Sequence, residues 1–339
     1  MRIANETPFE MERAVVLDKR GAETLVVVLK GTWTIKPDGT PILAERQCPI
    51  AAWDSFHGPP ESSSIKDEAE LGPLRPSTDC FLVGSVRAPD AGTRSLDVLF
   101  RAGPVEKRVR VFGERRWKRG AFGLSATEPE PFESVPLTWE LAYGGRDTSH
   151  ADPRNHGEEA RNPVGRGFRS ARSELPLADD LLPQLEDPTD LIRSAGQPVK
   201  PAAFAPIGRV WEPRRGYAGT YDQQWIEERM PILPEDFDPR FHQSAPVGLT
   251  APRRLEGGEL VEIVYGDDRA RLRFALPRPE PTAYVSLSGP ARELPMAMDS
   301  MLFDLDSMQL RAVWKVELDI HRRLPELSEI ACHLRGDLT

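Results

Sequence analysis

Thr24–Ile35, which reads TLVVVLKGTWTI, is the stretch that decides the fold class of this chain. It begins as a nearly continuous apolar run rich in valine and then alternates between polar and apolar residues. An apolar run that passes into strict alternation is the pattern of a half-buried strand. The stretch therefore predicts a β-strand and favours a β-rich fold.

Similar runs follow this stretch along the chain. They predict further strands at Asp79–Ala88, Leu96–Arg101, Val105–Val111, Val135–Tyr143, Glu259–Tyr265, Arg269–Leu276, Tyr284–Leu287, Ala297–Leu305 and Gln309–Ile320. Two pairs of these runs flank glycine-containing loops, at Ala102–Pro104 and Gly266–Asp268. Alternating runs joined by such loops predict hairpins.

Proline content and the scarcity of helical periodicity also indicate short elements. The chain has 33 prolines in 339 residues, which is about twice the usual share. Short helices are expected only at Pro176–Gln184, Tyr221–Arg229 and Leu324–Leu334, with Thr220 or Asp222 as N-cap of the second. We predict a mainly β fold: a β-sandwich, or two packed antiparallel sheets, with long irregular insertions and a few short helices.

Composition along the chain separates three regions. They are an N-terminal β region at 1–145, an irregular insertion at 146–250 and a C-terminal β region at 251–339. The first and last regions could share one core. Within the insertion, Arg146–Glu174 is a long polar loop, and loops of that length are usually functional, packed against the body or mobile.

Charge, cysteine content and hydropathy exclude several classes of function. The 44 basic and 53 acidic residues give a net charge of −9, which does not favour binding to nucleic acid or to an anionic membrane. No window approaches eighteen consecutive apolar residues, and the N-terminus has no apolar signal segment. The cysteines Cys48, Cys80 and Cys332 are odd in number and far apart, as in proteins of a reducing compartment. We expect a cytoplasmic protein without a disulfide framework.

A search for catalytic motifs gives no match. The chain lacks a phosphate-binding GxxxxGK[ST] loop, a GxGxxG turn after a strand, a GxSxG elbow and an HExxH pair. Its six histidines have no metal-ligand spacing. We therefore expect no enzyme activity, no cofactor and no metal.

The block Trp211–Phe241 concentrates the residue types that dominate binding hot spots. It contains the aromatics Trp211, Tyr217, Tyr221, Trp225, Phe237 and Phe241, the arginines Arg214, Arg215, Arg229 and Arg240, and seven carboxylates. Such residues build either an interaction surface or a rigid polar-aromatic core. Both interpretations stay open at this point.

The same block also allows a sugar cleft. Trp211 and Trp225 could be platforms for a sugar ring, with paired acids drawn from Asp222, Glu227, Glu228, Asp236 and Asp238. The neighbouring arginines offer a simpler explanation, because they can pair with these acids and fix a loop. We favour the structural network over the cleft.

Ordered motifs along the chain resemble those of a bacterial family. They are ETPF at Glu6–Phe9, the strand Lys30–Ile35, PFESVPL at Pro131–Leu137, AYGG at Ala142–Gly145, NPVGRG at Asn162–Gly167, WEPR at Trp211–Arg214, AGTYD at Ala218–Asp222, Trp225, Arg229 and PILPEDFD at Pro231–Asp238. The chain is similar here to the domain of unknown function DUF2169, found beside type VI secretion genes. This resemblance implies an adaptor or chaperone that loads a toxic effector onto the spike of the secretion machine. It implies no catalytic residue.

The resemblance and the residue types together give expectations for the site. Motifs as rich in glycine and proline as these often record tight backbone geometry and buried aromatics. We expect a structural role for the motif residues Trp211, Gly219, Thr220, Tyr221, Asp222, Trp225, Asp236 and Asp238. We expect partner contacts, on an exposed surface, from Arg214, Arg215, Tyr217 and Arg229. The loop Arg146–Arg172 is a second candidate for partner contact.

Three hypotheses for function remain. The first is a non-enzymatic adaptor or chaperone whose partners are a secreted effector and a spike or tip component. The second is a carbohydrate-active enzyme or sugar-binding module that uses Trp211, Trp225 and the nearby carboxylates. The third is a structural component of the secretion particle.

Overall fold

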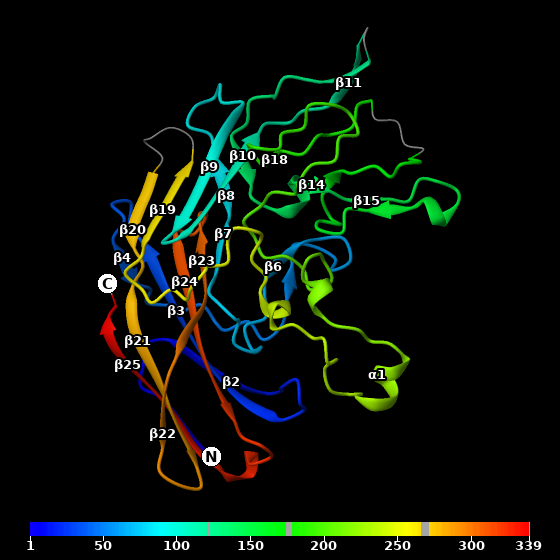
Figure 1. The fold of residues 1–339 in the computed structure, drawn as a ribbon. Helices are drawn as coiled ribbons and strands as arrows, with labels where there is room; N and C mark the ends of the chain where they lie inside the picture. Colours follow the sequence, from blue (N-terminus) through cyan, green and yellow to red (C-terminus); the bar gives the residue numbers. More distant parts are fainter. Residues whose placement is uncertain (121–122, 174–177, 266–270, 339) are drawn as a thin grey trace.

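Nearly all of the regular secondary structure is β-strand, and the longer strands form three main sheets (Figure 1). The computed structural model describes residues 1–120, 123–173, 178–265 and 271–338. Within these ranges there is one short α-helix, α1 (Gln223–Glu228), and otherwise only 3₁₀ turns: η1 (Trp139–Leu141), η2 (Pro153–Asn155), η3 (Arg215–Tyr217), η4 (Pro239–His242) and η5 (Leu324–Glu326). The predicted mainly β fold, with several packed sheets and few short helices, is confirmed.

The largest sheet has the strand order β2–β3–β24–β23–β7, with β4 paired to the end of β3. Its strands are β2 (Glu10–Leu17), β3 (Glu23–Ile35), β4 (Pro41–Leu43), β7 (Asp79–Val83), β23 (Ala297–Asp304) and β24 (Gln309–Asp319). All neighbours run antiparallel except β7 and β23, which run parallel. The sheet therefore unites strands from both ends of the chain.

Strand β3 covers the stretch Thr24–Ile35 and confirms the strand predicted there. Its apolar run is continuous because both faces of this strand are buried. Leu25, Val27 and Leu29 belong to the main core, whereas Val26 and Val28 belong to a smaller cluster on the opposite face.

Two further sheets complete the body. The five-stranded sheet has the order β18 (Leu185–Glu186), β10 (Val105–Phe112), β9 (Ser95–Ala102), β19 (Leu260–Tyr265) and β20 (Arg271–Ala275). The four-stranded sheet has the order β1 (Arg2–Asn5), β25 (Leu327–Asp337), β21 (Arg278–Leu287) and β22 (Arg292–Pro295). In the second of these, β1 and β25 run parallel.

Short two-stranded pairs occupy the loops between the main sheets. They are β5 (Ser55–Phe56) with β6 (Ile65–Asp67), β8 (Ser85–Arg87) with β13 (Ser134–Pro136), β11 (Trp117–Gly120) with β12 (Gly123–Ala126), β14 (Tyr143–Gly144) with β17 (Arg166–Gly167), and β15 (Arg146–Asp147) with β16 (Gly157–Glu158). The last two pairs organise the long polar loop of the predicted insertion.

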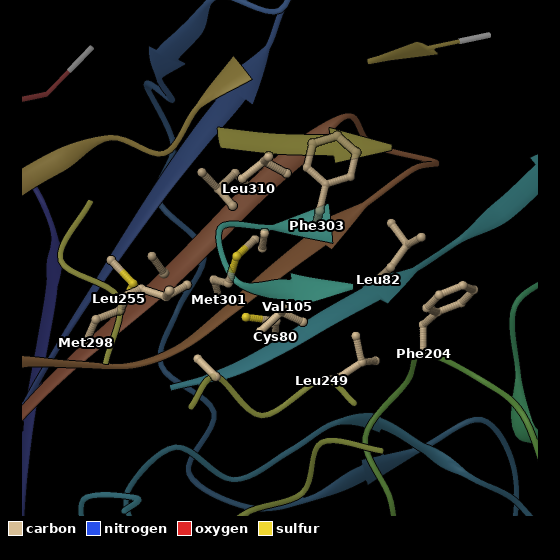
Figure 2. Close-up of a cluster of buried hydrophobic side chains, with 14 of the residues drawn as sticks. Cys80, Leu82, Val105, Phe204, Leu249, Leu255, Met298, Met301, Phe303 and Leu310 are labelled. Atoms are coloured by element: carbon tan, nitrogen blue, oxygen red, sulfur yellow. The ribbon is translucent and has the colours of Figure 1, made fainter. Parts of the chain in front are cut away.

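One hydrophobic cluster joins the sheets. Figure 2 shows part of it, where side chains of β7, β23 and β24 meet side chains of β10 and of three loop segments. Phe274 of β20 and Phe303 of β23 bring two sheets together, with ring centroids 5.7 Å apart. Trp33 of β3 and Trp314 of β24 meet edge to face at 6.1 Å within the largest sheet. Burial of such side chains is the main source of stability for a β fold.

Both predicted hairpins form. Strands β9 and β10 pair across Gly103-Pro104, and β19 pairs with β20. The turn of the second hairpin, Gly266–Asp268, lies outside the described residues. In both cases the alternation of buried and exposed residues matches the observed pairing.

The helix predicted at Leu324–Leu334 is wrong. Only the 3₁₀ turn η5 forms there, and β25 begins directly after it. Strand β25 lies between β21 and β1 and buries Leu327, Ile330 and Cys332. Pairing on both sides satisfies the backbone of this segment more completely than an isolated short helix would.

Two other sequence predictions need correction. The strand predicted at Val135–Tyr143 ends at Pro136, because the chain then turns into η1. Trp139 of η1 is held in this turn by its indole N–H, which donates to the carbonyls of Ala205 and Pro206, both at 3.0 Å. The helix predicted at Pro176–Gln184 is absent from its described part, 178–184, which forms a turn and a strand bridge.

Candidate functional site

The block Trp211–Phe241 divides into two parts with opposite environments. The base, residues 211–217 and 237–244, packs into the body of the protein. The arm, residues 218–236, carries α1 and extends from the body (Figure 1). The interpretation as a core therefore fits the base, whereas the arm is more exposed.

Trp211 anchors the base. It is 5% exposed and meets Trp139 edge to face, with ring centroids 5.9 Å apart. Its backbone carbonyl also accepts a hydrogen bond from the backbone N–H of Arg215 at 2.9 Å. The structure thus places Trp211 in the core, where a structural role was expected.

Arg214 is buried, so its predicted exposure is wrong. It is 2% exposed, forms an ion pair with Glu68 at 3.0 Å, and donates to the carbonyls of Ile207 and Phe241 at 2.7 and 3.0 Å. Arginine provides five N–H donors in a rigid plane, and these contacts use donors in three directions. The neighbouring Arg215 is exposed and pairs with Glu212 at 3.1 Å.

Arg214 belongs to a buried ion cluster that ties the base to the largest sheet. The cluster contains three cations and three carboxylates: Arg75, Arg214, Lys315, Glu68, Asp79 and Asp299. Arg75 is at its centre and contacts all three carboxylates. Each of these side chains is at most 8% exposed.

Hydrogen bonds to neighbouring groups also stabilise the charges of this cluster. Asp79 accepts from the backbone N–H groups of Ser244 and Ala245 at 2.7 and 3.1 Å, and from the Thr250 hydroxyl at 2.9 Å. Lys315 of β24 contacts Asp299 of β23 at 3.1 Å. Buried charges need such partners, since an unpaired one costs several kcal/mol.

Burial and neighbouring charges shift the pKa values in and beside this cluster. Burial raises the pKa of Asp79 to about 6, although Arg75 opposes the shift. Burial also lowers the pKa of His242 to about 4, and the nearby cations Lys315 and Arg214 add to this effect. His242 is therefore neutral at pH 7, and the Arg75 guanidinium donates to its backbone carbonyl at 3.0 Å.

The neck of the arm is closed by the AGTYD motif. Thr220 donates to Asp236 from its backbone N–H at 2.9 Å and from its hydroxyl at 2.7 Å. Gly219 has φ +83°, and a Cβ there would lie only 2.8 Å from Asp236 Oδ1 and 3.0 Å from the Phe237 nitrogen. Glycine is required at this position because the two ends of the arm approach each other so closely.

Helix α1 forms where the sequence predicts a helix at Tyr221–Arg229. Asp222 is its N-cap and accepts from the backbone N–H of Trp225 at 2.9 Å. The Trp225 indole donates to the carbonyl of Ile232 at 2.8 Å, which folds the arm back on itself. Tyr221 packs edge to face on Trp225 at 4.7 Å.

Arg229 and Lys19 fix the arm against the body. Arg229 donates to the carbonyls of Lys19 and Leu233, both at 3.0 Å, and pairs with Glu235 at 3.2 Å. Lys19 in turn donates to the carbonyl of Phe237 at 3.2 Å. Arg229 was predicted as a partner contact, but these bonds engage its guanidinium in holding the arm to the turn after β2.

The remaining motif residues lie at the junction of base and arm. Asp238 caps the turn η4 and pairs with Arg240 at 2.5 Å. The guanidinium of Arg240 lies over the ring of Tyr217, 4.3 Å from its centroid. Tyr217, another predicted partner contact, is half-buried and partly covered by Arg240.

The arm carries exposed apolar side chains as well as carboxylates. Tyr221 and Ile226 are each 50% exposed and Met230 is 62% exposed. A structural role was expected for Tyr221. Its ring does pack against Trp225, but Tyr221 is exposed and is not part of the core. The arm has five carboxylates and one arginine, a net charge of −4. Apolar anchors ringed by charge are typical of a protein-binding surface.

The contacts of the acids give no support to a sugar cleft. Trp211 is buried in the base, whereas Trp225 is in the arm. Hydrogen bonds from Thr220 lower the pKa of Asp236, and hydrogen bonds from Arg240 lower that of Asp238. A glycosidase needs one carboxyl with a raised pKa as its general acid, and these two shifts go in the opposite direction.

Two parts of the site were missed by sequence reasoning. The buried ion cluster could have been suspected from Lys315 and Asp299, which are charges inside apolar runs. The second is the exposed pair Ile226, within α1, and Met230, two residues after its end, which together are called the arm tip.

The chain belongs to the family described as "Uncharacterized protein conserved in bacteria (DUF2169)", which matches residues 20–315. This match includes the base, the arm and the buried ion cluster. No curated protein and no solved structure was found to match the chain. Among the described residues, no helix has the length and apolarity needed to cross a membrane, and no group of His, Cys, Asp and Glu side chains could hold a metal ion.

Proposed function

We propose that this protein is a non-enzymatic adaptor, or chaperone, that binds a type VI secretion effector in the cytoplasm and helps to load it onto the secretion spike. The arm is the effector-contacting surface. The observation that carries the proposal is the exposure of Tyr221, Ile226 and Met230 on a segment that is fixed rather than loose. A surface held in one conformation loses less entropy on binding.

The charge of the arm defines the chemistry of its partner. With a net charge of −4 around three apolar side chains, the arm fits an effector surface that presents apolar residues flanked by Lys or Arg. Opposite charges steer the encounter and set the orientation, while the apolar contacts supply most of the affinity.

Co-expression with the toxin encoded beside this gene tests the proposal. The toxin should co-purify in a fixed stoichiometry with the protein, and its soluble yield should rise. The proposal fails if no neighbouring toxin co-purifies or gains solubility. Ordered self-assembly of the protein alone, measured by light scattering, would favour a structural component of the particle instead.

A further inference from the structure

The arm and the largest sheet enclose an apolar groove of about 420 Å³. Its walls come from the end of β2 (Val16 and Leu17), from the arm (Pro231 and Ile232) and from Leu74 of the loop before β7. The groove is large enough for more than one apolar side chain. The proposed binding surface therefore extends from the arm tip onto the body.

Strand β2 lies at one margin of the largest sheet (Figure 1), and its end lines this groove. It pairs with β3 only, and in the described part of the chain no backbone hydrogen bond reaches residues 10–17 from any other segment. The outer edge of β2 thus presents free backbone N–H and C=O groups. A segment in extended conformation can pair with such an edge.

The charges along β2 are unevenly distributed. Glu10, Glu12 and Arg13 occupy its first half, whereas the second half, residues 14–17, carries no charge. Charged side chains normally protect a free edge from unspecific pairing. The unprotected half ends at the groove, which Val16 and Leu17 line, and Leu17 is 49% exposed.

The rim of the groove is acidic. Asp18, which pairs with Arg20 at 3.3 Å, and Glu317 line it, and the arm beside it has a net charge of −4. The only lysine of the lining, Lys19, donates to the carbonyl of Phe237, and His242 is held neutral by burial. An occupant with basic flanks meets complementary charge here, whereas an acidic one is repelled.

We propose that an extended segment of the effector, apolar at alternate positions and flanked by Lys or Arg, pairs with β2 at residues 14–17 and inserts an apolar side chain into the groove. This inference rests on the proposed adaptor function and specifies its partner. Backbone pairing supplies affinity, and the groove selects the side chain.

The experiment uses the full-length protein and the purified toxin encoded beside its gene. Leu17→Lys puts a cation at the groove, and Ile42→Lys is the matched control, since Ile42 is 40% exposed on β4 of the same sheet. We expect Leu17→Lys to weaken toxin binding by about tenfold or more, while Ile42→Lys leaves it unchanged. Hydrogen exchange of residues 14–17 should slow by about tenfold or more in the complex, because their free N–H groups become paired.

The outcomes separate this inference from the function on which it rests. If the toxin binds but exchange in β2 is unaltered and Leu17→Lys binds like Ile42→Lys, the groove inference is wrong and the adaptor function stands. If no toxin binds the unmodified protein, both are overturned. Circular dichroism and the thermal midpoint of Leu17→Lys establish that a loss of binding is not a loss of fold.

Discussion

Two neighbouring arginines, Arg214 and Arg215, show how environment separates residues of the same type. They are adjacent in the chain, yet Arg214 is 2% exposed within the ion cluster, whereas the Arg215 side chain is 53% exposed. The sequence could not distinguish them, because the partner that fixes Arg214 is Glu68, far away along the chain. What the motif does predict is a cation at this point.

Removing Arg214 should therefore destabilise the fold, and removing Arg215 should not. Arg214→Met removes one of the two cations that pair with Glu68 and the side-chain donor to the carbonyls of Ile207 and Phe241, which should lower the free energy of unfolding by about 3–5 kcal/mol. Arg215→Met should change it by about 0.5 kcal/mol or less. Urea unfolding measures both, and equal effects would contradict the assignment of Arg214 to the ion cluster.

His242 should make stability depend on pH. Its pKa is 6.5 in the unfolded reference and about 4 in the fold. Between these pH values His242 is protonated in the unfolded chain but neutral in the folded protein. The contribution of His242 to the free energy of unfolding is therefore fully present above pH 6.5 and is lost as pH falls toward 4. Asp79 acts in the opposite direction, since its raised pKa favours the folded state as pH falls below about 6.

A variant isolates the histidine contribution. His242→Phe keeps an aromatic ring beside Phe237 and Phe241 and does not titrate. Between pH 7 and pH 4.5 the unmodified protein should lose about 2 kcal/mol more of its unfolding free energy than His242→Phe does. The contribution of Asp79 cancels in this comparison. If the unfolding free energies of the two proteins depend on pH in the same way, the pKa of His242 is not lowered by folding.

At the scale of elements, the sequence pattern predicts secondary structure correctly where contacts between nearby residues determine it. The apolar run of β3 and the glycine loop between β9 and β10 predict their structures correctly. Strand β25 was missed because Leu324, Leu327, Ile330 and Leu334 are spaced as on a helix. Its conformation is set by β21 and β1, two strands distant in sequence. The arm is intermediate: its helix and cap are local, but its attachment to Lys19 is not.

The Asp236–Thr220 contact should control the order of the arm separately from the global fold. Asp236→Ala removes both hydrogen bonds at the neck, so the arm should open more often than in the unmodified protein. Trypsin should then cleave after Arg229 about tenfold faster, while the urea midpoint changes little. Asp306→Ala, which removes an acceptor for Ser85 outside the arm, is the control. Equal cleavage rates in both variants would mean that the neck does not hold the arm.

At the scale of the whole molecule, the β body carries the arm as a projecting segment. The ion cluster joins the base to β7, β23 and β24, so the body supplies a rigid mount for the arm. The sequence predicts the β body and directs attention to the right block. It could not predict which face of that block is exposed, because exposure depends on contacts between residues more than a hundred positions apart.

The affinity of the purified protein for the toxin encoded beside its gene, measured by isothermal titration calorimetry, tests the central claim most directly. Ile226→Glu combined with Met230→Glu removes two apolar contacts from the arm tip, and Val247→Glu does the same to an apolar residue that is 84% exposed elsewhere. We predict that the double variant loses affinity by about a hundredfold or more, while Val247→Glu binds like the unmodified protein. Undiminished binding by a folded double variant would contradict the arm as the effector-contacting surface.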